Sequence, residues 1–135
     1  MTQTFQFELV SPEAKLMSEP VTMAVVPGSE GDFGVMAGHA PLVATVRTGV
    51  VTIYRDNIQN ISERIFIAGG FADVTGDNCT VLAEQAVNVN DLDKADIEKQ
   101  LNQAEIDAKS AEDEAEKRRL QKRIDVLKAM QEAAQ

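Results

Sequence analysis

The sequence predicts a β + α fold, in which an N-terminal antiparallel β-sandwich is followed by a C-terminal α-helical hairpin. All eight glycines and all four prolines lie before residue 90, among short runs of β-branched and aromatic residues that alternate in polarity. Residues 90–135 contain neither glycine nor proline and are rich in alanine, glutamate, lysine, aspartate and glutamine, which favour helices. We therefore expect two domains, residues 1–89 and residues 90–135.

Strands are predicted where apolar residues recur at every second position, which is the period of a half-buried strand. Three such runs are Phe5, Phe7 and Leu9; Val21, Met23 and Val25; and Ile65 and Ile67 on either side of Phe66. Turn residues separate the runs at 18–20, 56–57, 69–70 and 75–78. This frequency of turns predicts an antiparallel sandwich or a flattened barrel.

Residues 27–41 concentrate the residue types that shape a backbone. The loop-shaping residues of this segment are Gly28, Gly31, Gly34, Gly38 and Pro41. A corner of the β-domain would account for them, but so many constrained positions favour a shaped loop that presents side chains. A phosphate-binding loop does not fit, because it needs a helix start and a basic residue, whereas this segment carries Glu30 and Asp32.

The C-terminal domain shows two narrow apolar stripes with helical spacing. The first is Ile97, Leu101, Ala104, Ala108 and Ala111, and the second is Leu120, Ile124, Leu127 and Met130. Asn90 with Asp93 would cap the first helix, and Ser110 with Asp113 fits a capping box at the start of the second. A hairpin that breaks near Ser110 follows, although no glycine or proline forbids one continuous helix.

Composition limits the partners and the chemistry. The net charge of −9 at pH 7 argues against nucleic acid and against an anionic lipid surface. No apolar stretch is long enough to span a bilayer, and residues 1–7 lack the features of a signal peptide, so we expect a soluble protein. A single histidine and a single cysteine cannot assemble a site of strong metal ligands, and no partner for a catalytic base is evident.

Both of these single residues have an expected structural role. Cys79 lies in an apolar run and is predicted to be a buried strand thiol. We expect His39 to brace the glycine-rich loop, with its ring bonded to a backbone carbonyl.

A long motif indicates the family. Residues 28–42 carry the pattern Gly-x-Glu-Gly-x-x-Gly-x-x-x-Gly-His-Ala-Pro-Leu, and Gly49 follows after an apolar stretch. With the strand-like run 5–11 at the start and Asp91-Leu92-Asp93 before the helical tail, the whole chain resembles the epsilon subunit of the bacterial F-type, proton-translocating ATP synthase. The resemblance implies a sandwich of about ten short strands and a two-helix regulatory tail.

The resemblance also implies a mechanical, non-catalytic function with no cofactor. The subunit belongs to the central stalk of the rotor, where it links the gamma subunit to the c-ring and couples proton translocation to ATP synthesis. Its c-ring contact loop would present Glu30, Asp32 and His39. We therefore expect a peripheral protein at the cytoplasmic face of the bacterial inner membrane, with no direct lipid insertion.

A basic block in the tail has an implied regulatory role. The basic block consists of Lys117, Arg118, Arg119, Lys122 and Arg123. In the family, such residues meet acidic groups of the alpha and beta subunits of the catalytic head when the tail extends, and this contact inhibits ATP hydrolysis. The charges alone also fit a solvated helix face, with pairs four residues apart such as Asp113 with Lys117 and Glu114 with Arg118.

Some family members bind ATP through the tail. In this chain Asp93 matches the aspartate of their motif, but Asp96 stands where the motif has an arginine. A carboxylate at that position repels phosphates instead of attracting them. We expect ATP binding to be weak or absent.

A second function fits the composition equally well. A free-standing β-sandwich adaptor with a coiled-coil tail would pair through the stripes that contain Leu101 and Ile124. Such an adaptor would self-associate, whereas a rotor subunit would be monomeric when isolated. The oligomeric state therefore distinguishes the two.

Overall fold

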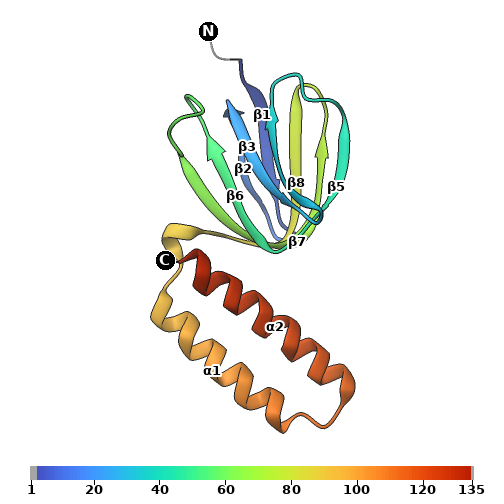
Figure 1. The fold of residues 1–135 in the computed structure, drawn as a ribbon, viewed down its shortest axis with the longest axis vertical. Helices are drawn as coiled ribbons and strands as arrows, with labels where there is room; N and C mark the ends of the chain where they lie inside the picture. Colours follow the sequence, from blue (N-terminus) through green and yellow to red (C-terminus); the bar gives the residue numbers. More distant parts are fainter. Residues whose placement is uncertain (1–2, 135) are drawn as a thin grey trace. The chain divides into compact units, whose positions relative to one another are not determined.

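The computed structural model describes residues 3–134, which form eight strands and two α-helices (Figure 1). The strands are β1 (Phe5–Val10), β2 (Lys15–Val21), β3 (Met23–Gly28), β4 (Gly31–Met36), β5 (Leu42–Val46), β6 (Gly49–Tyr54), β7 (Glu63–Val74) and β8 (Asn78–Asn88), and the helices are α1 (Lys94–Ser110) and α2 (Glu114–Ala133). The predicted β + α class is confirmed. Fewer strands are present among these residues than the expected ten, because β7 and β8 run unbroken for 12 and 11 residues.

The strands form one continuously paired sheet that folds around a core. Its order is β2-β1-β8-β7-β5-β3-β4, and β6 pairs with both β3 and β7. The β1–β8 pair is parallel, and the other paired strands are antiparallel. The core contains the predicted run Phe5, Phe7 and Leu9, all 3% exposed or less.

The inward face of β7 changes at Gly69 and Gly70, which were predicted to form a turn. Both glycines lie inside the strand with positive φ, +66° and +125°. Ile65 and Ile67 enter the core before them, whereas Ala72 enters it after them, so the alternation shifts by one residue. The pair therefore bends a continuous strand instead of reversing the chain.

Two further sequence expectations for the sandwich were wrong. Residues 18–20 lie in β2, since Pro20 is accommodated in an edge strand that pairs only with β1. In the second run, Val21 is fully buried as predicted, but the phase inverts after it: Ala24 and Val26 are fully buried, while Met23 and Val25 are half-buried. The chain bends at the buried Thr22, whose hydroxyl donates to the carbonyl of Arg55 at 2.7 Å. The other two predicted turns, at 56–57 and 75–78, are confirmed.

The chain divides after Asn88 into two compact units, of which the second contains both helices. α1 and α2 lie side by side as an antiparallel hairpin (Figure 1). Their buried residues are Ile97, Leu101 and Ala104 in α1 and Leu120, Ile124, Leu127, Met130 and Ala133 in α2. The predicted stripes are confirmed except at Ala108 and Ala111, which are half-exposed beside the connection between the two helices.

The helix ends differ from the predicted caps, although the break near Ser110 is confirmed. Asp93 caps α1, and Asn90 lies earlier, in a 3₁₀ turn at Val89–Asp91. Ser110 is the last residue of α1, and its hydroxyl donates to the carbonyl of Ile106 at 3.3 Å. Asp113 caps α2 alone, because its carboxylate accepts from the amide of Ala115 at 3.1 Å. Neither α1 nor α2 is long and apolar enough to cross a membrane.

Candidate functional site

The glycine-rich segment was predicted to be one shaped loop, but it forms a β-hairpin followed by a separate connection. β3 ends at Gly28, Ser29 and Glu30 form the turn, and β4 occupies Gly31–Met36 before the connection 37–41. The segment folds in this way because β3 and β4 pair in register along their whole length. β4 places Glu30 and His39 at opposite ends of a six-residue strand, roughly 20 Å apart at about 3.3 Å per residue. The structure therefore does not bring the three predicted contact residues together.

The tip of the β3–β4 hairpin is tight and presents Glu30 to solvent. Gly28 pairs with Gly31, and a Cβ atom on Gly28 would lie 2.7 Å from the carbonyl oxygen of Gly31. Gly31 itself has a φ of +134°. Glu30 is exposed in the turn between them. The close approach and the unusual φ explain two of the predicted loop-shaping glycines.

Arg47 connects the two strands of this hairpin. Its Nη1 atom donates to the carbonyl of Gly28 at 2.6 Å, and its Nη2 atom lies 2.5 Å from Oδ1 of Asp32. The side chains of Arg47 and Asp32 are 46% and 58% exposed. The carboxylate of Asp32 is thus already paired within the chain, whereas a residue that contacts only a partner protein would have no such internal pair.

The connection 37–41 is shaped by Gly38, whose φ is +84° and whose amide donates to the carbonyl of Gly76 at 2.9 Å. The His39 ring lies 2.7 Å from the carbonyl oxygen of Ala40 through Nδ1, so the predicted bond to a backbone carbonyl is confirmed. Gly34 lies within β4 without a positive φ, and Pro41 ends the connection before β5. Within residues 3–134, no group of three or more His, Cys, Asp or Glu side chains is placed to hold a metal ion.

An exposed apolar row crosses the outside of the sandwich, and sequence reasoning missed it. Phe71 on β7 pairs with Leu82 on β8, and Leu82 pairs with Val10 on β1, so these three side chains share one face. Phe71 is 48% exposed and Leu82 is 36% exposed. Val43 on β5, 71% exposed, lies on the same face in the adjacent row. Phe71 faces outward because the alternation of β7 shifts at the Gly69-Gly70 bend, and the sequence offered only the glycine pair, which was interpreted as a turn.

The basic block lies entirely on the exposed side of α2. Its ion pairs are three residues apart, Lys117 with Glu114 at 3.5 Å and Arg119 with Glu116 at 3.8 Å, in place of the predicted pairs. Asp113 instead caps the helix, where its carboxylate accepts from the amide of Ala115. Outside the block's own helix, Arg123 donates to the side chain of Gln100 on α1 at 2.9 Å.

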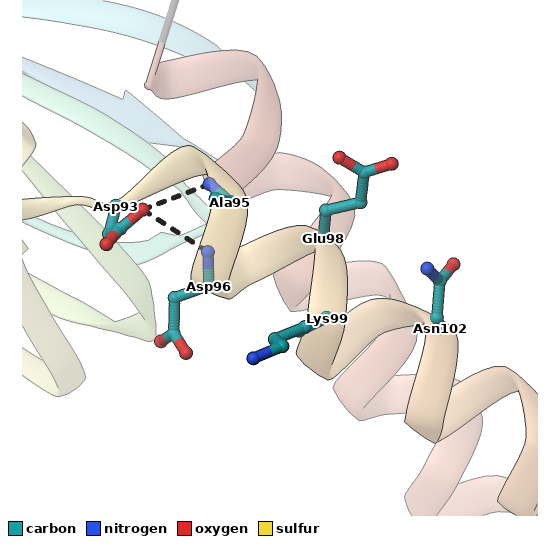
Figure 2. A pocket seen from close by; sticks show the side chains of 6 residues that line it. All are labelled: Asp93, Ala95, Asp96, Glu98, Lys99 and Asn102. Atoms are coloured by element: carbon teal, nitrogen blue, oxygen red, sulfur yellow. Dashed lines mark hydrogen bonds between the residues drawn. The ribbon is translucent and has the colours of Figure 1, made fainter.

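A shallow hollow of about 490 Å³ lies at the start of α1 (Figure 2). Its lining residues are Asp93, Ala95, Asp96, Glu98, Lys99 and Asn102. The carboxylate of Asp93 accepts from the amides of Ala95 and Asp96 at 3.0 and 3.3 Å, which occupies the donors that an anion would use. Three carboxylates against one lysine make this surface unfavourable for a polyphosphate.

Cys79 is fully buried in β8, as predicted. Burial, together with the charge of Asp73, raises the pKa of its thiol to about 12. The thiol is therefore neutral at physiological pH and poorly nucleophilic.

Comparison with known proteins adds independent findings. Residues 4–89 match the family described as ATP synthase, Delta/Epsilon chain, beta-sandwich domain. The chain is 49% identical over 127 residues to the ATP synthase epsilon chain of Rhodospirillum centenum, covering 92% of this chain and 87% of that one. It is 52% identical over 117 residues to the ATP synthase epsilon chain of Rhodospirillum rubrum, covering 87% and 86%.

Two solved structures share the fold. A chain of the Euglena gracilis mitochondrial ATP synthase, solved as OSCP, F1 and c-ring, aligns with a TM-score of 0.81 at 22% identity, covering 98% of this chain and 82% of that one. A chain from the central stalk and c-ring of the Tetrahymena thermophila mitochondrial ATP synthase aligns with a TM-score of 0.64 at 11% identity, covering 99% and 98%. These two similarities concern the fold alone.

Proposed function

Because the chain belongs to the delta/epsilon family of ATP synthase subunits, as a bacterial F-type epsilon chain, we propose that it links the gamma subunit to the c-ring in the rotor. It is a non-catalytic subunit of this complex. In this role the sandwich transmits rotation between its two partners and so couples proton translocation to ATP synthesis. No cofactor takes part.

The observation that carries this proposal is the exposed apolar row Phe71, Leu82 and Val10, with Val43 beside it. Large side chains grouped on one face of a sheet indicate a surface that a partner covers. The central part of a stable protein interface is apolar and poor in charge, which matches this row. We assign this face to gamma.

The c-ring contact is placed on the tip of the β3–β4 hairpin. Glu30 is exposed there and carries a charge that can meet polar loops of a ring. The connection that holds His39 lies at the other end of β4, so His39 is left out of this contact. The chain would then be held at the cytoplasmic face of the inner membrane through the ring, with no insertion of its own into lipid.

The helical unit is assigned a regulatory role. The basic block is exposed along α2 and can meet acidic groups of the alpha and beta subunits. The connection between the helices contains only residues 111–113, without glycine or proline. No residue of the connection is therefore incompatible with a helix, and in this proposal the hairpin converts to an extended form in which the tail inhibits ATP hydrolysis. The acidic hollow at the start of α1 supports a weak or absent response to ATP.

Sedimentation velocity with purified gamma from the same organism tests the assignment of the apolar row. The isolated chain should sediment as a monomer and shift to a one-to-one complex with gamma. Phe71→Asp should weaken the complex at least tenfold, because it places a charge in the centre of the contact. Ile106→Asp is the matched control, since Ile106 is 58% exposed on α1. A chain that self-associates and ignores gamma would instead support the adaptor function.

A further inference from the structure

We propose that Arg47 and Asp32 form an internal brace that sets the conformation of the hairpin tip, so that Asp32 positions Glu30 and does not itself dock. This inference rests on the proposed contact between the hairpin tip and the c-ring. It changes the expected role of one acidic residue and assigns a role to an arginine that the motif leaves out.

The guanidinium of Arg47 spans both strands of the hairpin at its narrow end. Gly28 is the last residue of β3, and Asp32 is the second residue of β4. Arg47 reaches the carbonyl of Gly28 at 2.6 Å and the carboxylate of Asp32 at 2.5 Å. A planar guanidinium can hold two acceptors in a fixed relation, which a lysine cannot do. The side chain of Arg47 therefore ties Gly28, just before the turn, to Asp32, which follows the turn by two residues.

The brace is anchored from outside the hairpin. Arg47 directly follows β5, which pairs with β7 along its length. The backbone amide of Arg47 donates to the carbonyl of Pro27 at 2.9 Å, and the amide of Ser29 donates to the carbonyl of Thr45 at 2.9 Å. These bonds hold the start of the turn against the end of β5. Arg47 is thus a fixed point from which the side chain restrains the tip.

The pairing leaves Glu30 as the acidic group available for docking. The charge of Asp32 is compensated by Arg47, whereas Glu30 is exposed in the turn. A surface that docks on the tip therefore needs a complement for one carboxylate and not for two. Because both partners of the brace are about half exposed, salt should weaken the pair moderately.

A double-mutant cycle tests the brace with the full-length chain, gamma and detergent-solubilised c-ring from the same organism. Asp32→Asn should weaken binding to the ring about two- to fivefold, the range of a half-exposed ion pair, and leave gamma binding unchanged. Arg47→Met should cost at least as much, because it also removes the bond to Gly28. In the Arg47→Met background, Asp32→Asn should cost nothing more. Lys128→Met, an exposed charge removal on α2, is the control.

The other outcomes overturn the proposal in distinguishable ways. An equal loss from Asp32→Asn in both backgrounds would show that Asp32 docks directly. Unchanged ring binding in both single variants, with Glu30→Gln still harmful, would show that the tip needs no brace. A wild-type chain that does not bind the ring would refute the proposed docking itself. Amide hydrogen exchange at residues 29–31 of the free chain reports on the brace alone, and should become several times faster in Arg47→Met.

Discussion

Replacement of Gly70 by alanine is expected to destabilise the sandwich more than any other glycine-to-alanine change in the described chain. A Cβ atom at this position would lie 1.8 Å from the carbonyl oxygen of Leu82 and 2.9 Å from its carbonyl carbon. Both are backbone atoms of the paired strand β8, so no side-chain rotation can relieve the overlap. The φ of +125° is also one that alanine rarely adopts.

The expected loss follows from these two contributions. Backbone strain at an unfavourable φ costs about 1–3 kcal/mol, and a forced backbone shift in a packed region costs about 1–3 kcal/mol more. The free energy of unfolding should therefore fall by about 2–6 kcal/mol, out of a total of about 5–15 kcal/mol for a typical protein. The melting temperature should fall by roughly 10 °C or more, at about 4–8 °C per kcal/mol for a unit of this size.

Two other glycines separate the contributions. Gly31 has a φ of +134° but open space around its Cβ position, so Gly31→Ala should lose only the strain of about 1–3 kcal/mol. Gly76 has neither a positive φ nor a neighbour within 4 Å, so Gly76→Ala should change stability by less than about 1 kcal/mol. Urea unfolding followed by fluorescence of Tyr54, the only tyrosine and in a chain without tryptophan, reports on the sandwich. Equal stability of the Gly70 and Gly76 variants would refute the reasoning.

Further predictions concern the buried thiol, the helix cap and the tail. Between pH 9 and 12 the folded chain keeps the Cys79 proton that the unfolded chain has lost. The free energy of unfolding should therefore decrease with pH by up to about 1.4 kcal/mol per pH unit. Urea titrations should show a steeper decrease for the wild-type chain than for Cys79→Ala, and parallel curves would contradict this. Asp113→Ala removes the cap of α2 and should lower the stability of the helical hairpin by about 0.5–2 kcal/mol. Ser110→Ala removes no cap and should be nearly neutral, and thermal unfolding followed by circular dichroism measures both variants. Replacement of the five residues of the basic block by glutamine should raise ATP hydrolysis in the assembled enzyme, and an unchanged rate would count against inhibition by the block. Isothermal titration should detect no ATP binding to the wild-type chain, and tight binding would show that Asp96 does not prevent it.

The fold class could be predicted because its signals are local. The change from period-two runs to glycine-free helical stripes requires only neighbouring residues, and both stripes are buried largely as expected. Errors arose where a tertiary contact decides the local conformation. Gly69-Gly70 has the composition of a turn, but the close approach of the Leu82 carbonyl keeps it inside a strand. No pattern within β7 itself shows that contact.

The candidate site was predicted less completely for the same reason. The glycine-rich segment was recognised, yet the strand β4, which separates Glu30 from His39, forms by pairing with β3, and the motif does not encode that pairing. Arg47 and Asp32 are 15 residues apart in sequence and meet only because β5 ends beside the hairpin. Phe71 is outward only because the alternation shifts at the bend. Each of these positions depends on how distant strands pair.

The central claim is that one chain holds gamma and the c-ring at two separate surfaces. Sedimentation of the full-length chain with gamma and detergent-solubilised c-ring tests it most directly. The wild-type chain should form a ternary complex; Phe71→Asp should lose gamma and keep the ring, and Glu30→Lys should lose the ring and keep gamma. Loss of both partners in either variant, or of neither partner in both, would contradict the account.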